Sequence, residues 1–295
     1  MSNRVILTDT GCAPTDELVK NYGIEIMGMK LFLDDLTCFD GENIQKDEYY
    51  SKIEKLKNFN TNPPLVFEIK KIYENLKKKG YDEIVSVHVS SKMSKLIATC
   101  QNAKNLVSGI DVKILDTENM SIGAYFIVEK VAQLIKQGMP YEDIEKLMPE
   151  IRKSVLIQVS LSTLKYLVKN KRIGKAQGIM GDFLKMRPIL GIDEEGYLAP
   201  LAKIRGKENV INKISDSAVE FLQSRPYNPK VYMTYGLEKN KKQMEAVFES
   251  FKAKMEKTDI KNYTVIKSRI WPTIANLSGP ATYAFAVYGE ESPIG

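Results

Sequence analysis

The stretch that decides the fold class is Ile84-Val85-Ser86-Val87-His88-Val89, which continues into Ser90-Ser91-Lys92-Met93-Ser94. The first six residues are mostly β-branched and predict a buried strand. The hydroxyl-rich turn after them leads to a helical pattern at 96–107 and then to a second apolar run at 112–115. A strand, a helix and a strand in this order predict a βαβ unit with parallel strands.

The same alternation extends over the first half of the chain and predicts an α/β fold. Further strands are expected at 5–8 and 24–33, and the run Asn60-Thr61-Asn62-Pro63-Pro64 is expected to break the chain. The first half is therefore expected to form a parallel-sheet, Rossmann-like domain over residues 1–153. Its other helices are expected at 14–23, 46–56, 66–78, 121–137 and about 140–153.

The pattern changes after residue 153. Two apolar runs flank the acidic turn Asp193-Glu194-Glu195-Gly196 and predict a hairpin over 188–204. The rest of this half mixes strands and helices, which predicts a smaller C-terminal α/β domain with a mixed or antiparallel sheet over residues 154–295. Its strands are expected at 155–161, 231–235, 264–269 and 283–287, and its long helices at 210–223 and 239–255.

The composition is that of an ordinary globular protein, with 295 residues, 43% of them hydrophobic and 27% charged. The net charge of +6 without a basic, aromatic tract argues against nucleic-acid binding. There is no run of eighteen apolar residues to cross a membrane and no signal-peptide pattern at the start. The 3 cysteines have no CxxC spacing, so we expect no disulfide framework, no zinc site and a cytoplasmic location.

A single histidine limits the catalytic chemistry that the chain can perform. His88 lies in a predicted strand, where a core imidazole is the more frequent role, and a Ser-His-Asp triad could be built only around it. The P-loop pattern and the GxGxxG pattern are both absent. We therefore expect a chain that is poor in catalytic groups, with no metal and no cofactor of its own.

Hydroxyl and carboxylate side chains gather where the predicted parallel strands end. Thr8-Asp9-Thr10, residues 90–94 and Asp116-Thr117 each follow a strand. Each could simply cap the next helix, but the carboxyl ends of parallel strands share one edge, where ligands bind. Such a rim, rich in donors and poor in acid–base groups, suits a small anionic or carbonyl head group. Arg172 and Arg205 could pair with that group, or could be solvated surface residues.

The segment 173–190 is apolar and contains several small residues, among them Gly174, Ala176 and Gly178. Small residues and methionines suit an elongated apolar tunnel. They equally suit a tightly packed junction between domains, and the periodicity does not separate these two interpretations.

A set of motifs spread over nearly the whole chain occurs together. These are Thr8-Asp9-Thr10, Thr61-Asn62-Pro63-Pro64, Ser90-Ser91-Lys92-Met93-Ser94, Asp116-Thr117 with Ser121-Ile122-Gly123, the run 163–174, Pro188-Ile189-Leu190 and Ser278-Gly279-Pro280. In combination they resemble the DegV family, the fatty-acid-binding subunits of bacterial fatty acid kinase. The resemblance implies the two domains described above, with a long-chain fatty acid buried between them.

The resemblance also implies roles for individual residues. Thr61 and Ser94 would bind the carboxylate, and Arg172 would lie near the head group. Arg205 would face the partner protein.

Near the C-terminus, Leu277 stands where the family usually has a histidine, which implies that Asn276 or Ser278 takes over its contact. A partner, the catalytic subunit of the fatty acid kinase, would supply ATP and metal and convert the bound acid to an acyl phosphate. This chain would then be a carrier with no catalytic residues and no ligand besides the fatty acid.

Two other functions stay open on the residues alone. One is a protein that binds another acyl-type lipid without coupling to a kinase. The other is a stand-alone α/β enzyme that uses Asp9, Asp116 or Ser94, although no residue that would orient them is evident in the sequence.

Overall fold

The computed structural model describes residues 3–182 and 186–295, and its N-terminal half is built on a parallel sheet. The strand order is β2-β1-β6-β7, and all neighbours run parallel, as the βαβ pattern predicts. The central strands are almost wholly buried because helices cover both faces, which explains their continuous apolar runs. The strands are β1 (Arg4–Asp9), β2 (Glu25–Met27), β6 (Glu83–His88) and β7 (Asp111–Asp116).

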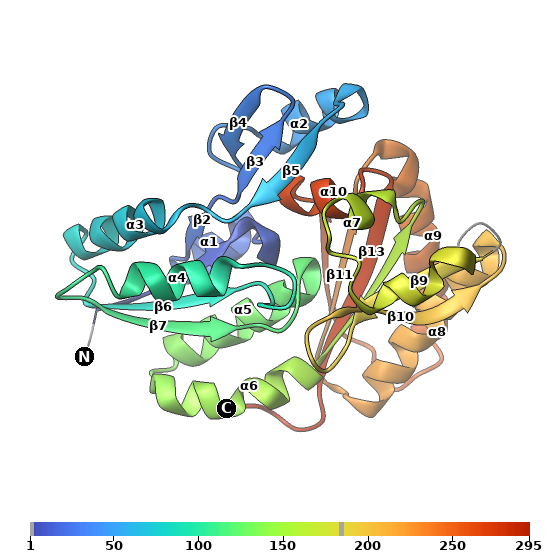
Figure 1. Cartoon of the computed structure of the whole chain (residues 1–295). Coiled ribbons are helices and arrows are strands. Elements are labelled where there is room, and N and C mark those ends of the chain that lie inside the picture. The colour runs from blue at the N-terminus through green and yellow to red at the C-terminus, as the bar shows by residue number, and fades with distance from the viewer. Residues whose placement is uncertain (1–2, 183–185) are drawn as a thin grey trace.

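Figure 1 shows how helices sandwich this sheet. The helices α3 and α4 pack together on one face, whereas α1, α5 and α6 lie on the other. Most of α5 is buried because it also contacts strands of the second sheet. The bounds are α1 (Asp16–Tyr22), α3 (Val66–Lys78), α4 (Leu96–Lys104), α5 (Ser121–Lys136) and α6 (Tyr141–Lys153).

The C-terminal half contains a six-stranded mixed sheet of order β10-β9-β8-β13-β11-β12. Within the described part of the chain, only the β11–β12 pair of this sheet is parallel, so the predicted α/β class with a mixed second sheet is confirmed. Helices α8 (Lys207–Ser224) and α9 (Glu238–Met255) cover one face, and α5 packs on the other. The strands are β8 (Val155–Leu161), β9 (Arg187–Ile192), β10 (Leu198–Ile204), β11 (Tyr227–Tyr235), β12 (Thr264–Arg269) and β13 (Thr282–Glu290).

A small antiparallel sheet of order β4-β3-β5 corrects two of the sequence expectations. The single strand expected at 24–33 is two strands in different sheets, and the break expected at 60–64 begins with a strand. In β5, Thr61 pairs with Leu31, so tertiary pairing overrides the low strand propensity of the asparagines until Pro63 ends the strand. The elements are β3 (Lys30–Leu33), β4 (Leu36–Phe39), β5 (Phe59–Asn62), the helix α2 (Lys46–Lys52) and the 3-10 turn η2 (Ile53–Lys55).

A short buried helix, α10 (Pro272–Ser278), connects the small sheet to the rest of the protein and was not predicted. It packs against β5, β3, α2, the 3-10 segment η1 (Thr10–Cys12) and the short helix α7 (Lys165–Lys169). The carboxylate of Asp40 caps its first turn, since Oδ2 accepts hydrogen bonds from the backbone N–H of Thr273 at 2.8 Å and from its hydroxyl at 2.6 Å. The first turn of α10 is thus stabilised by Asp40, a residue from a distant part of the chain.

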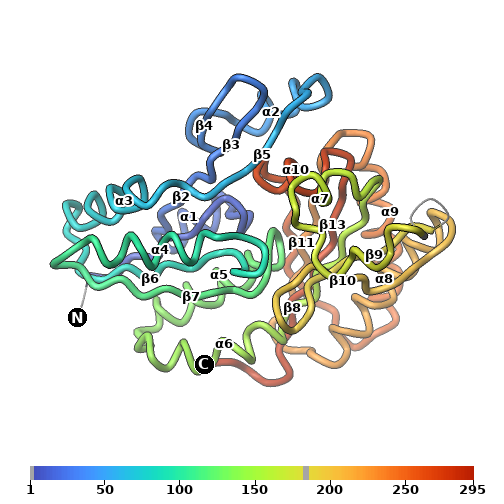
Figure 2. The backbone as a smooth tube through the Cα atoms, in the orientation of Figure 1, coloured from blue at the N-terminus to red at the C-terminus, as the bar shows by residue number. Residues whose placement is uncertain are grey.

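The two halves share a continuous junction around α5. The chain leaves α6 at Lys153 and enters the second sheet at Val155. The ammonium of Lys130 on α5 lies 3.0 Å from the carboxylate of Glu290 on β13, and both side chains are buried. Figure 2 shows the chain after β13 returning beside α6. There Ile294 joins the hydrophobic core around the parallel sheet.

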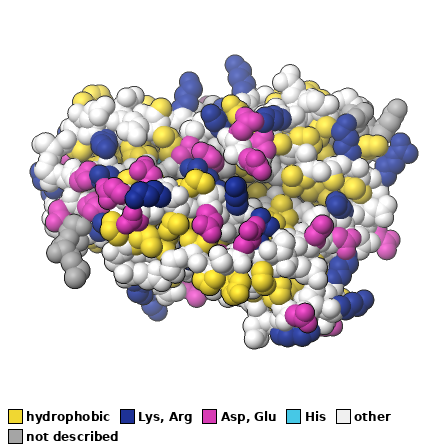
Figure 3. Space-filling model, turned by 90° about the horizontal axis from the view of Figure 1, so that it is seen from below, with side chains coloured by type: hydrophobic (Ala, Val, Ile, Leu, Met, Phe, Trp, Pro, Cys, Tyr) yellow, Lys and Arg dark blue, Asp and Glu magenta, His cyan; other side chains and the backbone are white. Residues whose placement is uncertain are grey.

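Acidic and basic side chains are interspersed on the surface that Figure 3 shows. This face has no extended basic tract of the kind that binds nucleic acid. Among the described residues, no helix combines the length and the apolar character needed to span a membrane.

We predict that Asp40 makes stability fall as the pH rises from about 4 to 7. Burial raises the pKa of Asp40 from 3.8 to about 6, although the Thr273 hydrogen bonds and Lys46 lower it. The native state therefore holds this proton more tightly than the unfolded chain, and the resulting stabilisation is lost as the pH rises through 6. Between pH 4.5 and pH 7 this contribution changes by about 2 kcal/mol, which urea unfolding of the wild type and Asp40→Asn at these two pH values would measure.

The quantity compared is the free energy of unfolding of the wild type minus that of the variant, because all other titrating groups are common to both. We expect this difference to favour the wild type more at pH 4.5 than at pH 7. Parallel stability curves for the two proteins would show that Asp40 titrates normally.

Candidate functional site

The amide of Asn276, at the centre of α10, organises a buried polar cluster. Its Oδ1 accepts a hydrogen bond from the hydroxyl of Tyr49 at 2.7 Å. Its Nδ2 donates to the carbonyl of Asn60 at 3.1 Å and to Oγ1 of Thr61 at 3.2 Å. Because Thr61 accepts from Asn276, its own hydroxyl proton is available to a further acceptor. Asn276 and Thr61 are both buried, so that acceptor would lie away from bulk water.

The loop after α7 joins this cluster through Asn170. The side-chain amide of Asn170 donates to the backbone carbonyl of Asn276 at 3.0 Å. Arg172 in turn donates from Nη1 to the carbonyl of Asn170 at 2.5 Å and from Nε to the carbonyl of Met93 at 3.2 Å. These bonds leave other guanidinium N–H groups of Arg172 available for an anion.

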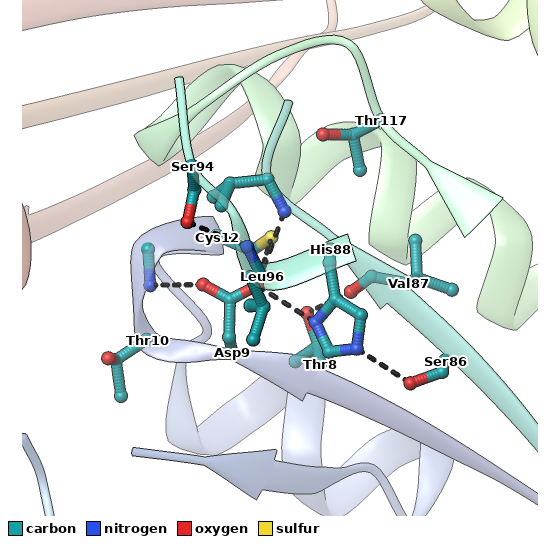
Figure 4. A network of polar contacts seen from close by, with 12 residues as sticks. Thr8, Asp9, Thr10, Cys12, Ser86, Val87, His88, Ser94, Leu96 and Thr117 are labelled. Carbon is teal, nitrogen blue, oxygen red and sulfur yellow. Dashed lines mark hydrogen bonds and ion pairs between the residues drawn. The ribbon is translucent and has the colours of Figure 1, made fainter. Parts of the chain in front are cut away.

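Ser94 lies on the turn that Arg172 contacts, one residue after Met93. Its Oγ accepts a hydrogen bond from the backbone N–H of Leu96 at 3.2 Å, within the turn that precedes α4, as Figure 4 shows. Among the described residues, no hydrogen bond joins Ser94 to Thr61 directly. The structure therefore brings Thr61, Asn276 and Arg172 into one network, with Ser94 on the adjoining turn.

The other two residues singled out in the sequence lie outside this network. Ser278 donates from Oγ to the carbonyls of Ile274 and Gly279, at 3.0 and 3.3 Å, and so closes the last turn of α10. Arg205 is exposed between β10 and α8.

A narrow apolar cavity of about 30 Å³ lies against α7 and α10, near the polar cluster. Met120 and Ser121 at the start of α5 contribute to its wall from the N-terminal half of the chain. The remaining lining comes from the second half of the chain: Ile157, Val159, Leu161, Leu167, Leu190, Leu198, Ile270, Ile274, Leu277, Ser278, Thr282 and Ala284. A long acyl chain needs far more room, so the flexible leucine and methionine side chains of the wall would have to move to admit one.

The segment 173–190 contributes little to this cavity, contrary to the tunnel interpretation. Ala176 and Ile179, in the 3-10 segment η3 (Gly174–Asp182), pack into the hydrophobic core between the two halves of the chain. Of the described residues in this segment, only Leu190 lines the cavity. The residues of this segment that the structure describes therefore fit the alternative interpretation, a packed junction. Residues 183–185 lie outside the described part of the chain.

His88 does form the triad-like arrangement that the sequence allowed. Figure 4 shows its ring between Asp9 and Ser86, with Nδ1 at 3.0 Å from Asp9 Oδ2 and Nε2 at 2.6 Å from Ser86 Oγ. All three side chains are fully buried, so a substrate has no route to the Ser86 hydroxyl. Burial lowers the pKa of His88, but Cys100 and Asp9 outweigh it and raise the pKa to about 10. The imidazolium and Asp9 therefore form a structural ion pair in the core.

The residues of the enzyme alternative are engaged in holding the backbone. Asp9 Oδ1 accepts from the N–H of Gly11 at 2.8 Å, and Asp116 Oδ1 accepts from the N–H of Glu118 at 2.8 Å. Ser94 accepts from the backbone N–H of Leu96 in the turn before α4. Among residues 3–182 and 186–295, no three His, Cys, Asp or Glu side chains are grouped to hold a metal ion.

Two members of the cluster, Tyr49 and Asn170, were not singled out in the sequence. Tyr49 was assigned only to a helical face, because nothing local reveals that its hydroxyl meets Asn276. The one available signal for α10 was Pro272, since proline is common in the first turn of a helix.

The chain matches one protein family over nearly its whole length. The model of the DegV family, described as uncharacterised proteins, matches residues 4–290. A DegV domain-containing protein of Clostridium perfringens is 29% identical over 234 residues, which cover 77% of this chain and 81% of that protein. One from Clostridium acetobutylicum is 27% identical over 214 residues, or 72% of this chain and 76% of that protein.

Solved structures of similar fold cover almost the whole chain. A fatty-acid-binding DegV family protein from Thermus thermophilus superimposes with a TM-score of 0.86 at 22% identity, over 98% of this chain and 100% of that chain. DegV of Bacillus subtilis, described as a fatty acid binding protein, gives 0.85 at 23% identity over the same shares. A stearic-acid-binding protein from Eubacterium ventriosum gives 0.82 at 19%, over 99% of both chains. With the family model spanning nearly all its residues, the chain belongs to the DegV family.

Proposed function

We propose that this protein is a non-catalytic carrier that binds a long-chain fatty acid between its two domains and presents the carboxylate to a partner kinase. The observation that carries the proposal is that α7 and α10 each contribute to both the apolar cavity and the polar cluster. On α10, Ile274 and Leu277 line the apolar cavity while Asn276 faces the polar cluster. Leu167 of α7 lines the same cavity, and Asn170 just after it binds α10. The apolar cavity would take the tail of the fatty acid, and the polar cluster on the neighbouring face of α10 would take its acidic head.

The solved relatives support the chemical class of the ligand. Those named above are described as binding fatty acids, and one of them as binding stearic acid. Burying a C16 chain at ~0.8 kcal/mol per methylene supplies roughly 12 kcal/mol before the costs of ordering and of opening the cavity. Head-group hydrogen bonds contribute on the order of 1 kcal/mol each. The tail would set the affinity, and the head group would set the orientation.

At the head group, Thr61 would donate its free hydroxyl proton to the carboxylate. Arg172 would offer the guanidinium N–H groups that Asn170 and Met93 do not use. Leu277 stands at the position of the family's histidine. Asn276, which precedes it, already has both amide protons bonded, to Asn60 and to Thr61. Its role would be to fix the rotamer of Thr61, whereas Ser278 belongs to the cavity wall.

The coupled reaction would be phosphoryl transfer within a complex with the catalytic subunit of a fatty acid kinase. A carboxylate oxygen would attack the γ-phosphorus of ATP, the bond to the β–γ bridging oxygen would break, and ADP would leave with the electron pair. The partner would hold ATP and metal, which agrees with a cytoplasmic location. Arg205 is exposed and would contribute to the docking surface.

The second candidate is a lipid carrier that works without a kinase. Leu277 favours it, because this residue stands where the family usually has a histidine and cannot exchange a proton with the bound acid as a histidine could. A protein that binds lipid tightly but never supports acyl phosphate formation would fit this description.

The carrier function predicts that purified protein contains or takes up a fatty acid. Mass spectrometry of the organic extract of denatured protein should detect a long-chain acid, and delipidated protein should bind palmitate or oleate with a stoichiometry near one. The apolar transfer free energy is the reason to expect retention through purification. An empty protein that also fails to bind either acid would exclude the carrier.

The head-group assignment predicts that Thr61→Val weakens palmitate binding about five- to tenfold, because one hydrogen bond to a charged acceptor is lost. Titration calorimetry on delipidated protein would measure this change. Thr37→Val is the matched control, since Thr37 is exposed on β4 of the same small sheet. Equal affinities for the wild type and Thr61→Val would place the carboxylate elsewhere.

If Arg205 contributes to docking, its substitution should affect the rate of acyl phosphate formation but not the binding of lipid. Arg205→Glu should bind palmitate like the wild type but lower the rate of acyl phosphate formation with the kinase about tenfold, because an interfacial charge is reversed. Lys213→Glu, an exposed charge reversal on α8, is the control. An unchanged rate with Arg205→Glu would remove Arg205 from the docking surface.

A further inference from the structure

A second enclosed cavity lies between the six-stranded sheet and the first turns of α8 and α9. Its volume is about 40 Å³, which holds roughly three water molecules. Ser160 of β8 and Tyr283 of β13 form part of its wall, whereas their neighbours Val159 and Ala284 line the apolar cavity. Successive side chains of a strand point to opposite faces of the sheet. The sheet therefore separates this cavity from the proposed lipid site.

Two cationic side chains without an anionic partner line the cavity. Arg187 begins β9 and Lys207 begins α8, and neither side chain forms an ion pair or a hydrogen bond within the described part of the chain. No Asp or Glu is present among the described lining residues. The carboxylates of the two first turns, Glu208 and Glu238, belong to exposed residues outside the cavity. The cavity thus has a positive charge that no neighbouring carboxylate balances.

A buried pair of hydroxyl groups offers a hydrogen-bond donor to this cavity. Ser160 and Tyr283 are paired across β8 and β13, and only 5% and 8% of their surfaces are exposed. Burial raises the pKa of Tyr283, while a hydrogen bond with Ser160 and the charge of Arg187 offset part of the rise. Two hydroxyls that bond to each other use one of their two protons, so the second proton is available to a ligand.

The side-chain oxygen of Asn240, in the first turn of α9, is an acceptor without a donor. This Oδ1 is buried and has no hydrogen-bond partner among the described residues, and Asn240 lines the cavity. A buried acceptor without a donor is costly, so a fitting ligand carries a donor as well as negative charge.

Inorganic phosphate meets both requirements, because it is an anion that keeps one P–OH proton at neutral pH. Sulfate has the same tetrahedral shape but no proton at this pH. A phosphate monoester has lost nearly all of its second proton, since that proton has a pKa of about 6.

The first turns of α8 and α9 add the positive ends of two helix dipoles. Both helices are 18 residues long, and residues of both first turns line the cavity. Neither Gly206 nor Leu237, which precede the two helices, forms a side-chain cap. Helix N-termini of this kind favour an anion.

We propose that this cavity binds inorganic phosphate. Arg187 and Lys207 would balance the charge of the ion, and the hydroxyl pair of Ser160 and Tyr283 would donate to one of its oxygens. Asn240 would accept the hydrogen bond from the P–OH group. The proposal goes beyond the lipid carrier function and does not depend on it, since the two cavities lie on opposite faces of the sheet.

The test is calorimetric titration of inorganic phosphate into the full-length protein at about pH 7.5 and constant ionic strength, because salt screens exposed charges. The variants are Arg187→Gln, Tyr283→Phe and, as the control, Lys213→Gln. Lys213 is exposed on α8 and does not line the cavity. Tyr283→Phe keeps the ring and removes only the buried hydroxyl, whereas Arg187→Gln changes an exposed side chain and so provides a variant that does not disturb the core. Sulfate and glycerol 3-phosphate are further arms.

We expect one phosphate to bind per chain, with affinity reduced about tenfold in Arg187→Gln, about threefold in Tyr283→Phe and less than twofold in Lys213→Gln. Sulfate and glycerol 3-phosphate should bind about fivefold more weakly than phosphate, because neither donates a proton to Asn240.

Absence of saturable phosphate binding to the wild type would overturn the site. Equal weakening by Arg187→Gln and Lys213→Gln would also overturn it, because the attraction would then be a general effect of surface charge. Unchanged affinity in a folded Tyr283→Phe variant would contradict a buried site, and equal affinities for sulfate and phosphate would contradict the assignment to phosphate.

Discussion

The buried amide of Asn276 is the interaction on which the arrangement of the candidate site depends. It joins α10 to α2 through Tyr49 and to β5 through Asn60 and Thr61, at 2.7 to 3.2 Å. A buried amide without these partners would cost several kcal/mol, so α10 and the small sheet are held in one relative position. That position places the Thr61 hydroxyl beside helices whose other faces line the apolar cavity.

The sequence predicts the layers of this protein better than its site. The runs at 84–89 and 155–161 are strands because they are apolar and β-branched, and local pattern suffices to find them. β5 was missed because its asparagines form a strand only through pairing with β3. The contact between Tyr49 and Asn276 spans 227 residues, and no local pattern encodes such a contact. The role of Thr61 came only from family resemblance, whereas the residues alone already offered Arg172 as a partner for an anion or as a solvated side chain.

The buried ion pair of His88 and Asp9 illustrates why geometry alone does not define a catalytic site. Ser86, His88 and Asp9 are within hydrogen-bond distance in the order of a hydrolase triad. They are nevertheless enclosed by the core, and Asp9 also binds the N–H groups of Gly11 and Val89. Their arrangement fixes the loops at the carboxyl ends of β1 and β6, which is the edge where the polar rim was expected.

The central claim is that an acyl tail occupies the apolar cavity once its wall opens. A crystal structure of the protein with palmitate brominated near its terminal carbon tests it most directly, because the anomalous signal of bromine locates the tail independently of the fitted chain. The account predicts one bromine peak in contact with Ile157, Leu190 or Ala284 and a carboxylate at Thr61. A bromine peak on the surface, or in another cavity with this one still closed, would contradict it.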